Sequence, residues 1–181
     1  KNFFEIIIAP KYDEDALNTL KSKKNLRIIE SNFKTPKDYS LRSISGGFLA
    51  QSQNINDDYE LNIVSEKKPD NQQLEDLKFA WNLSSFIKSN SILLVKNKTL
   101  LGMGAGQPNR VMSVKIAGEV AGKKSIGSVL ASDAFFPFID SVIKADELGV
   151  KCIIQPGGSI NDNDVINEAN RREIVMIFTN Q

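Results

Sequence analysis

The chain has 181 residues, of which 41% are hydrophobic and 25% charged, and its formal net charge at pH 7 is +1. This composition is typical of a globular domain, and a charge this small gives no broad basic field for holding nucleic acid or a membrane surface. A single cysteine excludes an internal disulfide and a cysteine-based metal cluster, and no apolar stretch approaches the ~20 residues of a membrane span or forms a signal peptide, so we expect a cytoplasmic protein.

The first third of the chain combines short strand patterns with one helix pattern. A strand rich in Ile and Phe is predicted over residues 3–9, and Asp13 is expected to cap a helix that runs to about Ser22. Further predictions are a strand at 26–29, weak alternation at 41–52 broken by Gly46-Gly47, a polar loop at 54–58 and a strand at 61–64. The charged, proline-containing segment 67–70 predicts a boundary between the C-terminal part of a first α/β lobe at 1–66 and a second α/β lobe at 67–181.

Strand and helix patterns alternate after that boundary. A helix is predicted over 71–88, where apolar residues recur at three- and four-residue steps and Trp81 is interpreted as a core anchor. The other predicted elements are strands at 91–95, 99–103, 128–131, 151–154 and 174–178, helices at 109–121, 138–148 and 161–170, and a turn at Asn97-Lys98. Such alternation indicates a layered α/β sheet.

A glycine-rich loop joins one of these strands to a helix. Gly102, Gly104 and Gly106 stand at alternate positions, the helix is expected to open near Asn109, and Arg110 adds a planar fork of donors. The spacing is neither the dinucleotide fingerprint nor a Walker loop. Two interpretations stay open: a site for a phosphate or carboxylate at the helix start, or a turn that only packs helix on strand.

Other loops follow strands, where ligands of open α/β sheets bind. The loop at 131–138 contains three phenylalanines, which either fill core or form the wall of a pocket that stacks a flat ring. In it, Asp133 is able to cap the next helix, which is the default expectation, to hold a cation or to contact a ligand. The loop at 155–159 is either a ligand loop or a tight turn, and Ser159 is able to cap the helix that follows. Asn90 either offers a ligand both a donor and an acceptor or forms a helix C-cap.

These loops together resemble a known family. The matching strings are Phe79-Ala-Trp and Lys88-Ser-Asn90, Gly104-Ala-Gly-Gln-x-Asn-Arg110, Ala131-Ser-Asp-Ala-Phe-Phe-Pro-Phe138, Gln155-Pro-Gly-Gly-Ser159, Phe178-Thr179 and Ile6-Ile-Ile-Ala-Pro10. In order and spacing they resemble the AICAR transformylase part of the bifunctional purine-biosynthesis enzyme that also carries IMP cyclohydrolase. The resemblance extends over essentially the whole chain.

The resemblance implies a fold, a reaction and partners. The implied fold is a layered α/β/α arrangement of cytidine-deaminase-like lobes without the catalytic zinc. The implied reaction transfers a formyl group from 10-formyltetrahydrofolate, the co-substrate, to AICAR ribotide, giving FAICAR ribotide in purine (IMP) biosynthesis. No metal, nucleic acid or membrane is required, and the enzyme works as an intertwined homodimer.

The resemblance also implies roles for single residues. Asn90, Arg110 and Phe135 would contact AICAR ribotide, with Asn90 also supporting catalysis. The residues implied for folate binding are Val111, Asp140, Ser159 and Ile160. The chemistry agrees in part, because an arginine suits a polar or anionic nucleotide group, a phenylalanine suits stacking on an aminoimidazole, and a carboxylate accepts hydrogen bonds from a pterin-like ring.

Departures from the family pattern limit what we expect of the chain alone. It contains no histidine, whereas the family's catalytic Lys-His pair lies upstream of the matching region, and Ile139 stands where many relatives have arginine. We therefore expect a C-terminal fragment of the transformylase, inactive in isolation. The alternative is a non-catalytic ligand-binding or dimerisation module. A deaminase-like hydrolase needs His/Cys zinc ligands, which are not available in this sequence.

Overall fold

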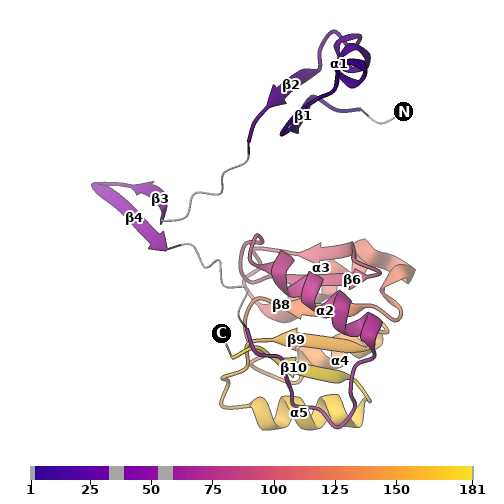
Figure 1. Cartoon of the computed structure of the whole chain (residues 1–181). Coiled ribbons are helices and arrows are strands. Elements are labelled where there is room, and N and C mark those ends of the chain that lie inside the picture. The colour runs from indigo at the N-terminus through magenta and orange to yellow at the C-terminus, as the bar shows by residue number, and fades with distance from the viewer. Residues whose placement is uncertain (1–2, 33–38, 53–58, 181) are drawn as a thin grey trace. The chain divides into compact units, whose positions relative to one another are not determined.

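A computed structural model describes residues 3–32, 39–52 and 59–180, and the predicted loop at 54–58 lies outside these residues. The chain divides into two compact units, Lys1–Ile55 and Asn56–Gln181, which are considered separately (Figure 1). The predicted lobe boundary at 66/67 stays a prediction. Strand β5 (Asn62–Ile63) precedes this predicted boundary, but it belongs to the second unit and pairs with another strand of that unit.

The first unit contains two small strand pairs. β1 (Ile6–Ala9) lies parallel to β2 (Arg27–Glu30), and α1 (Glu14–Lys21) connects them. Asp13 caps α1 as predicted, because its carboxylate accepts the Ala16 N–H at 2.7 Å. The weak alternation at 41–52 belongs to an antiparallel hairpin of β3 (Tyr39–Ile44) and β4 (Gly47–Ser52), which turns at Gly46 with a φ of 82°.

The second unit is built on a six-stranded sheet with the order β5-β10-β9-β8-β6-β7. Its other strands are β6 (Ile92–Lys96), β7 (Thr99–Gly104), β8 (Val129–Ser132), β9 (Cys152–Gln155) and β10 (Val175–Phe178). β8, β9 and β10 are parallel, whereas β6 is antiparallel to both β8 and β7, and β5 is antiparallel to β10. The predicted α/β class is thereby confirmed, with a mixed sheet.

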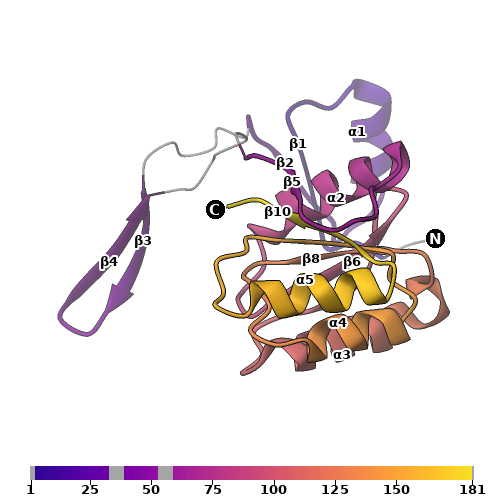
Figure 2. The same ribbon diagram turned by 90° about the horizontal axis from the view of Figure 1, so that it is seen from below.

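Helices cover both faces of this sheet (Figure 2). α2 (Asn71–Ser84) lies on one face, where it closes a core cluster that includes Leu77, Val129 and the buried Cys152. The helices on the other face are α3 (Arg110–Ala121), α4 (Asp140–Glu147) and α5 (Asp162–Arg171), which close the larger cluster. Trp81 packs against the first cluster, as expected of a core anchor. No helix of the described residues is long and apolar enough to cross a membrane.

Two predicted helices are longer than the observed ones. The helix expected to reach residue 88 ends at Ser84, because the hydroxyls of Ser84 and Ser85 donate to the carbonyls of Trp81 and Asn82. Side-chain bonds of this kind compete with the helical ladder. The helix expected from residue 138 begins only at Asp140.

The strand directions bring several loops to one edge of the sheet. The carboxyl ends of β7, β8, β9 and β10 lie at the same edge as the amino end of β6, because β6 is antiparallel to its neighbours. This edge therefore carries the loops at 85–91, 105–109, 133–139 and 156–161. Every residue for which the resemblance implies a ligand lies in one of these loops or in the first turn of the helix that follows.

Candidate functional site at the sheet edge

Arg110 is the centre of a hydrogen-bonded cluster at this edge. It opens α3 and is only 7% exposed. Its Nη1 donates to Asp133 Oδ1 at 2.6 Å and to Ser132 Oγ at 2.9 Å, and its Nη2 donates to Asn90 Oδ1 at 2.7 Å. The guanidinium therefore faces protein groups from β8 and from the segment before β6, and it does not stand free at a helix entrance.

Asn90 is held at both ends of its side-chain amide. Its Oδ1 accepts from Arg110, and its Nδ2 donates to the Gln107 carbonyl of the glycine-rich loop at 2.8 Å. Its own carbonyl accepts from the Ser113 hydroxyl at 3.0 Å. The interpretation of Asn90 as a helix C-cap is wrong, because α2 ends at Ser84 and Asn90 instead connects two loops.

Asp133 does not cap the following helix. The residue before α4 is Ile139, which makes no side-chain capping bond. Asp133 Oδ1 instead accepts from Arg110 and from the Ser91 N–H at 2.7 Å. Burial raises the pKa of Asp133, but hydrogen bonds from Ser89, Arg110 and Ser91 and the charge of Arg110 outweigh it, so the pKa lies below its ordinary value. The carboxylate is therefore charged at neutral pH.

The glycine-rich loop has a packing role at its first two glycines. A Cβ at Gly102 would lie 2.2 Å from the Ala117 carbonyl oxygen, and a Cβ at Gly104 would lie 2.1 Å from the Ser113 carbonyl oxygen. Gly102 and Gly104 thus pack the helix on the strand, and whether the loop also holds a ligand stays a prediction. Asn109 caps α3 by accepting the Met112 N–H at 2.9 Å. Gly106, with a φ of 65°, donates its N–H to the Lys88 carbonyl.

The three phenylalanines of the loop after β8 have different environments. Phe136 is fully buried, and its N–H donates to the Gln155 side chain of β9 at 2.6 Å. Phe135 is 40% exposed and Phe138 is 63% exposed. Core packing thus accounts for Phe136 alone, and the exposed Phe135 ring follows Asp133 by two positions at the sheet edge.

The residues implied for folate binding lie on neighbouring loops. Ser159 and Ile160 precede α5, and Ile160 is almost wholly exposed. Ser159 does not cap α5, because the residue at the N-cap position of this helix is Asn161. The Ser159 hydroxyl accepts the Asn161 N–H at 3.1 Å. Asp140 opens α4, and its carboxylate accepts the Ser141 N–H at 2.7 Å. Val111, next to Arg110 in α3, is half-buried.

One hydrogen bond connects the loops before α4 and α5. The Asn161 side chain donates to the Pro137 carbonyl at 2.7 Å. Beside this contact lies a shallow groove of about 460 Å³, lined by Phe138, Ile139, Asn161, Asp164, Asn167, Glu168 and Arg171. The arrangement gives the edge a mixed aromatic and polar surface next to Asp140 and Ile160.

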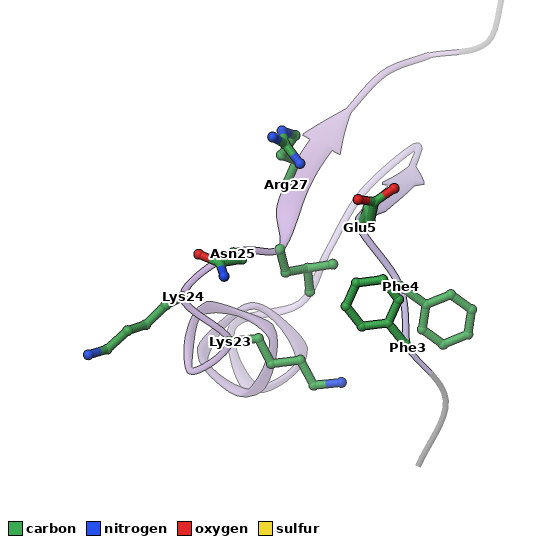
Figure 3. Close-up of a pocket in the computed structure, with 8 residues that line it drawn as sticks. Phe3, Phe4, Glu5, Lys23, Lys24, Asn25 and Arg27 are labelled. Carbon is green, nitrogen blue, oxygen red and sulfur yellow. The ribbon is translucent and has the colours of Figure 1, made fainter.

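A separate pocket of about 730 Å³ lies in the first unit (Figure 3). The rings of Phe3 and Phe4 lie on the segment that leads into β1, Lys23 follows α1, and Arg27 lies on β2. None of the residues implied for ligand binding lines this pocket. It is therefore distinct from the cluster around Arg110.

Sequence reasoning did not assign Asp133 and Ser132 to the cluster around Arg110. The available signal was a charged residue at the end of a buried strand, next to a strand that begins with Asn90-Ser91. Among the described residues, no three His, Cys, Asp or Glu side chains gather into a group that could hold a metal ion. The expected independence from metals stays a prediction.

Comparisons with curated relatives cover nearly the whole chain, and a family model matches its first two thirds. The family model described as "AICARFT/IMPCHase bienzyme" matches residues 1–120. The bifunctional purine biosynthesis protein PurH of Dictyostelium discoideum is 48% identical over 98% of this chain, and that of Bacillus subtilis is 47% identical over 98%. In both alignments the chain spans about 35% of the relative's length.

Solved structures are more distant. Form 2 of Acinetobacter baumannii RibD aligns over 60% of this chain and 33% of its own, with 18% identity and a TM-score of 0.38. Form 1 of the same protein has a TM-score of 0.40 at 17% identity over 58% of this chain and 34% of its own. An alignment this loose does not bear on the expected deaminase-like lobes, and the α/β assignment rests on the sheet itself.

Proposed function

This chain belongs to the AICARFT/IMPCHase bienzyme family, and from that premise we propose that it supplies the AICAR ribotide-binding part of a formyltransferase of purine biosynthesis. The reaction transfers the formyl group of 10-formyltetrahydrofolate to the amino group of AICAR ribotide, giving FAICAR ribotide. The chain's share of this reaction is binding and orientation.

The observation that carries the proposal is the contact between Asn90 and Arg110. The side chains meet at 2.7 Å, although 20 positions separate them in the sequence. Their amide and guanidinium groups offer hydrogen bonds to a polar ligand such as the carboxamide of AICAR. Phe135, on the loop after Asp133, offers an exposed ring for stacking on the aminoimidazole. These three residues are those proposed to contact the nucleotide.

We assign the folate co-substrate to the adjoining part of the same edge. Val111 neighbours Arg110 on α3, and Asp140, Ser159 and Ile160 lie on the two loops that the Asn161–Pro137 hydrogen bond connects. Exposed apolar groups and a carboxylate suit an aromatic ring system that carries polar edges. A homodimer, in which a second subunit completes the site, is part of the same proposal.

General base catalysis requires a group from outside this chain or a shifted carboxylate or lysine within it. The chain contains no histidine, and histidine is the side chain that titrates without perturbation near neutral pH. In the proposal, Asn90 supports catalysis by orienting the substrate, and proton transfer is assigned to another segment of the complete gene product.

Formyl-transfer assays with AICAR ribotide and 10-formyltetrahydrofolate test this proposal. We expect the complete gene product to form FAICAR ribotide, and Asn90→Ala to lower kcat/KM roughly two- to tenfold, since a lost hydrogen bond to a neutral carboxamide costs about 0.5–1.5 kcal/mol. The 181-residue chain alone is expected to bind ligand without turnover. Absence of turnover by the complete product would support the alternative of a non-catalytic binding module.

A further inference from the structure

The donors of Arg110 are divided between two sides of the cluster. Nη1 faces Asp133, Ser132 and the Ser91 carbonyl, whereas Nη2 faces Asn90. The side chain is 6% exposed, so the planar fork is held almost entirely by protein atoms. A guanidinium held in this way has one orientation, because rotation would break bonds on both sides at once.

Asp133 supplies the only carboxylate in contact with Arg110 among the described residues. Burying an arginine without a counter-charge is costly, so the position of Arg110 depends on this partner. Asp133 is itself fixed from three directions, by the Ser91 N–H, by the Ser89 hydroxyl and by Arg110. Its hydrogen bonds are directed into the protein, which argues against a direct role in ligand contact.

Asn90 receives its orientation from the other side of Arg110. Its Oδ1 accepts from Nη2, and one Nδ2 hydrogen is used by the Gln107 carbonyl. The second Nδ2 hydrogen has no partner among the hydrogen bonds of the described residues. An amide fixed by these two bonds presents that remaining donor in a defined direction. If Arg110 moved, this donor would lose its direction although Asn90 itself remained.

We infer that Asp133 is a positioning residue of the nucleotide site, acting through Arg110 to orient the side chain of Asn90. The inference rests on the proposed function for its ligand, and it adds to that proposal a residue with no ligand contact of its own. Ser132, whose hydroxyl accepts from the same Nη1, shares this task.

A second aspartate with backbone hydrogen bonds provides a matched control. Asp76 of α2 is 3% exposed, and its carboxylate accepts the backbone N–H groups of Asn97 and Lys98 at 2.8 and 2.7 Å. Like Asp133, it accepts hydrogen bonds from backbone N–H groups, but it is more deeply buried, it holds the β6–β7 turn and it does not touch Arg110. Replacing Asp76 therefore measures the effect of losing a structural carboxylate away from the cluster around Arg110.

The experiment is a double-mutant cycle in the complete gene product, with AICAR ribotide affinity measured by calorimetry. We expect Asp133→Asn to weaken binding by about tenfold, and Arg110→Ala with Asp133→Asn to bind no more weakly than Arg110→Ala alone, because the aspartate acts through the arginine. Asp76→Asn should leave the affinity within about twofold and add independently to Arg110→Ala. Should Asp133→Asn fail to fold, Ser132→Ala takes its place in the cycle.

The outcomes separate this inference from the proposed function. Failure of the unmodified protein to bind AICAR ribotide would contradict the proposed function. Binding by the unmodified protein together with an unchanged affinity in Asp133→Asn, or with additive effects of Asp133→Asn and Arg110→Ala, would overturn the positioning role alone.

Discussion

At the scale of single residues, Arg110 is the centre of the cluster at the sheet edge. Arg110 connects the end of β8, the segment before β6 and the start of α3, since its partners Asp133, Asn90 and Ser91 come from the first two of these. Its charge lies beside that of Asp133 in a site that excludes most water, where charge-assisted bonds are stronger than at the surface. The orientation of Asn90 follows from this arrangement.

Phe135 and Phe136 are neighbours with opposite expected roles, and substitutions separate them. Phe136→Ala should destabilise the fold by about 3–5 kcal/mol, because its ring is fully buried. Phe135→Leu keeps most of its contacts and should change stability by less than about 1.5 kcal/mol. It should nevertheless raise the KM for AICAR ribotide, since stacking contributes about 0.5–1.5 kcal/mol.

Urea unfolding of the chain, followed through the fluorescence of its single tryptophan, Trp81, gives the stabilities. Steady-state kinetics of the complete gene product gives the KM. A Phe135→Leu variant that unfolds as easily as Phe136→Ala and has an unchanged KM would place both rings in the core and remove the stacking role.

At the scale of elements, the contact between β7 and α3 depends on the absence of side chains. Gly102 and Gly104 let the strand approach the carbonyl groups of the helix, and this approach places Arg110 within reach of Asn90. The N-cap at Asn109 sets where the helix begins. The position of the site thus follows from strand–helix packing together with a local capping bond.

Gly104→Ala tests this contact. The added Cβ would lie 2.1 Å from the Ser113 carbonyl oxygen, so α3 must shift. We expect the free energy of unfolding to fall by about 1–3 kcal/mol. Lys115→Ala, on the exposed face of the same helix, should change stability by no more than about 0.5 kcal/mol. Equal unfolding midpoints of the two variants in urea would show that the helix does not pack closely on β7.

Local signals in the sequence predicted the elements but not all of the site. The cap at Asp13, the start of a helix near Asn109, the turn at Asn97-Lys98 and the strand–helix alternation depend on neighbours in the chain and were predicted correctly. The Asp133 side chain pairs with Arg110, which lies 23 positions away in the sequence, and no local pattern predicts such a contact. Because only the local pattern was visible, the sequence favoured Asp133 as a cap of the following helix, and this prediction was wrong.

At the scale of the whole molecule, the proposed site belongs to the second unit alone. The residues proposed for the nucleotide and for folate all fall within Asn56–Gln181, on the edge where the carboxyl ends of four strands meet. The family model, by contrast, matches residues 1–120 and so includes the first unit together with Asn90 and Arg110. Phe135 and the loops proposed for folate lie beyond residue 120, in the part of the chain that only the alignments with the PurH relatives cover.

The most direct test of the account is the affinity of the complete gene product for AICAR ribotide, measured by calorimetry for the unmodified protein, Arg110→Ala and Arg110→Lys. The account predicts that the alanine variant binds more weakly by about 1.5–3 kcal/mol, or roughly ten- to a hundredfold. The lysine variant should recover only part of the loss, because an ammonium group cannot reproduce the fork that holds Asn90 and Asp133 together. Affinities equal to that of the unmodified protein in both variants would contradict the assignment of this cluster as the nucleotide site.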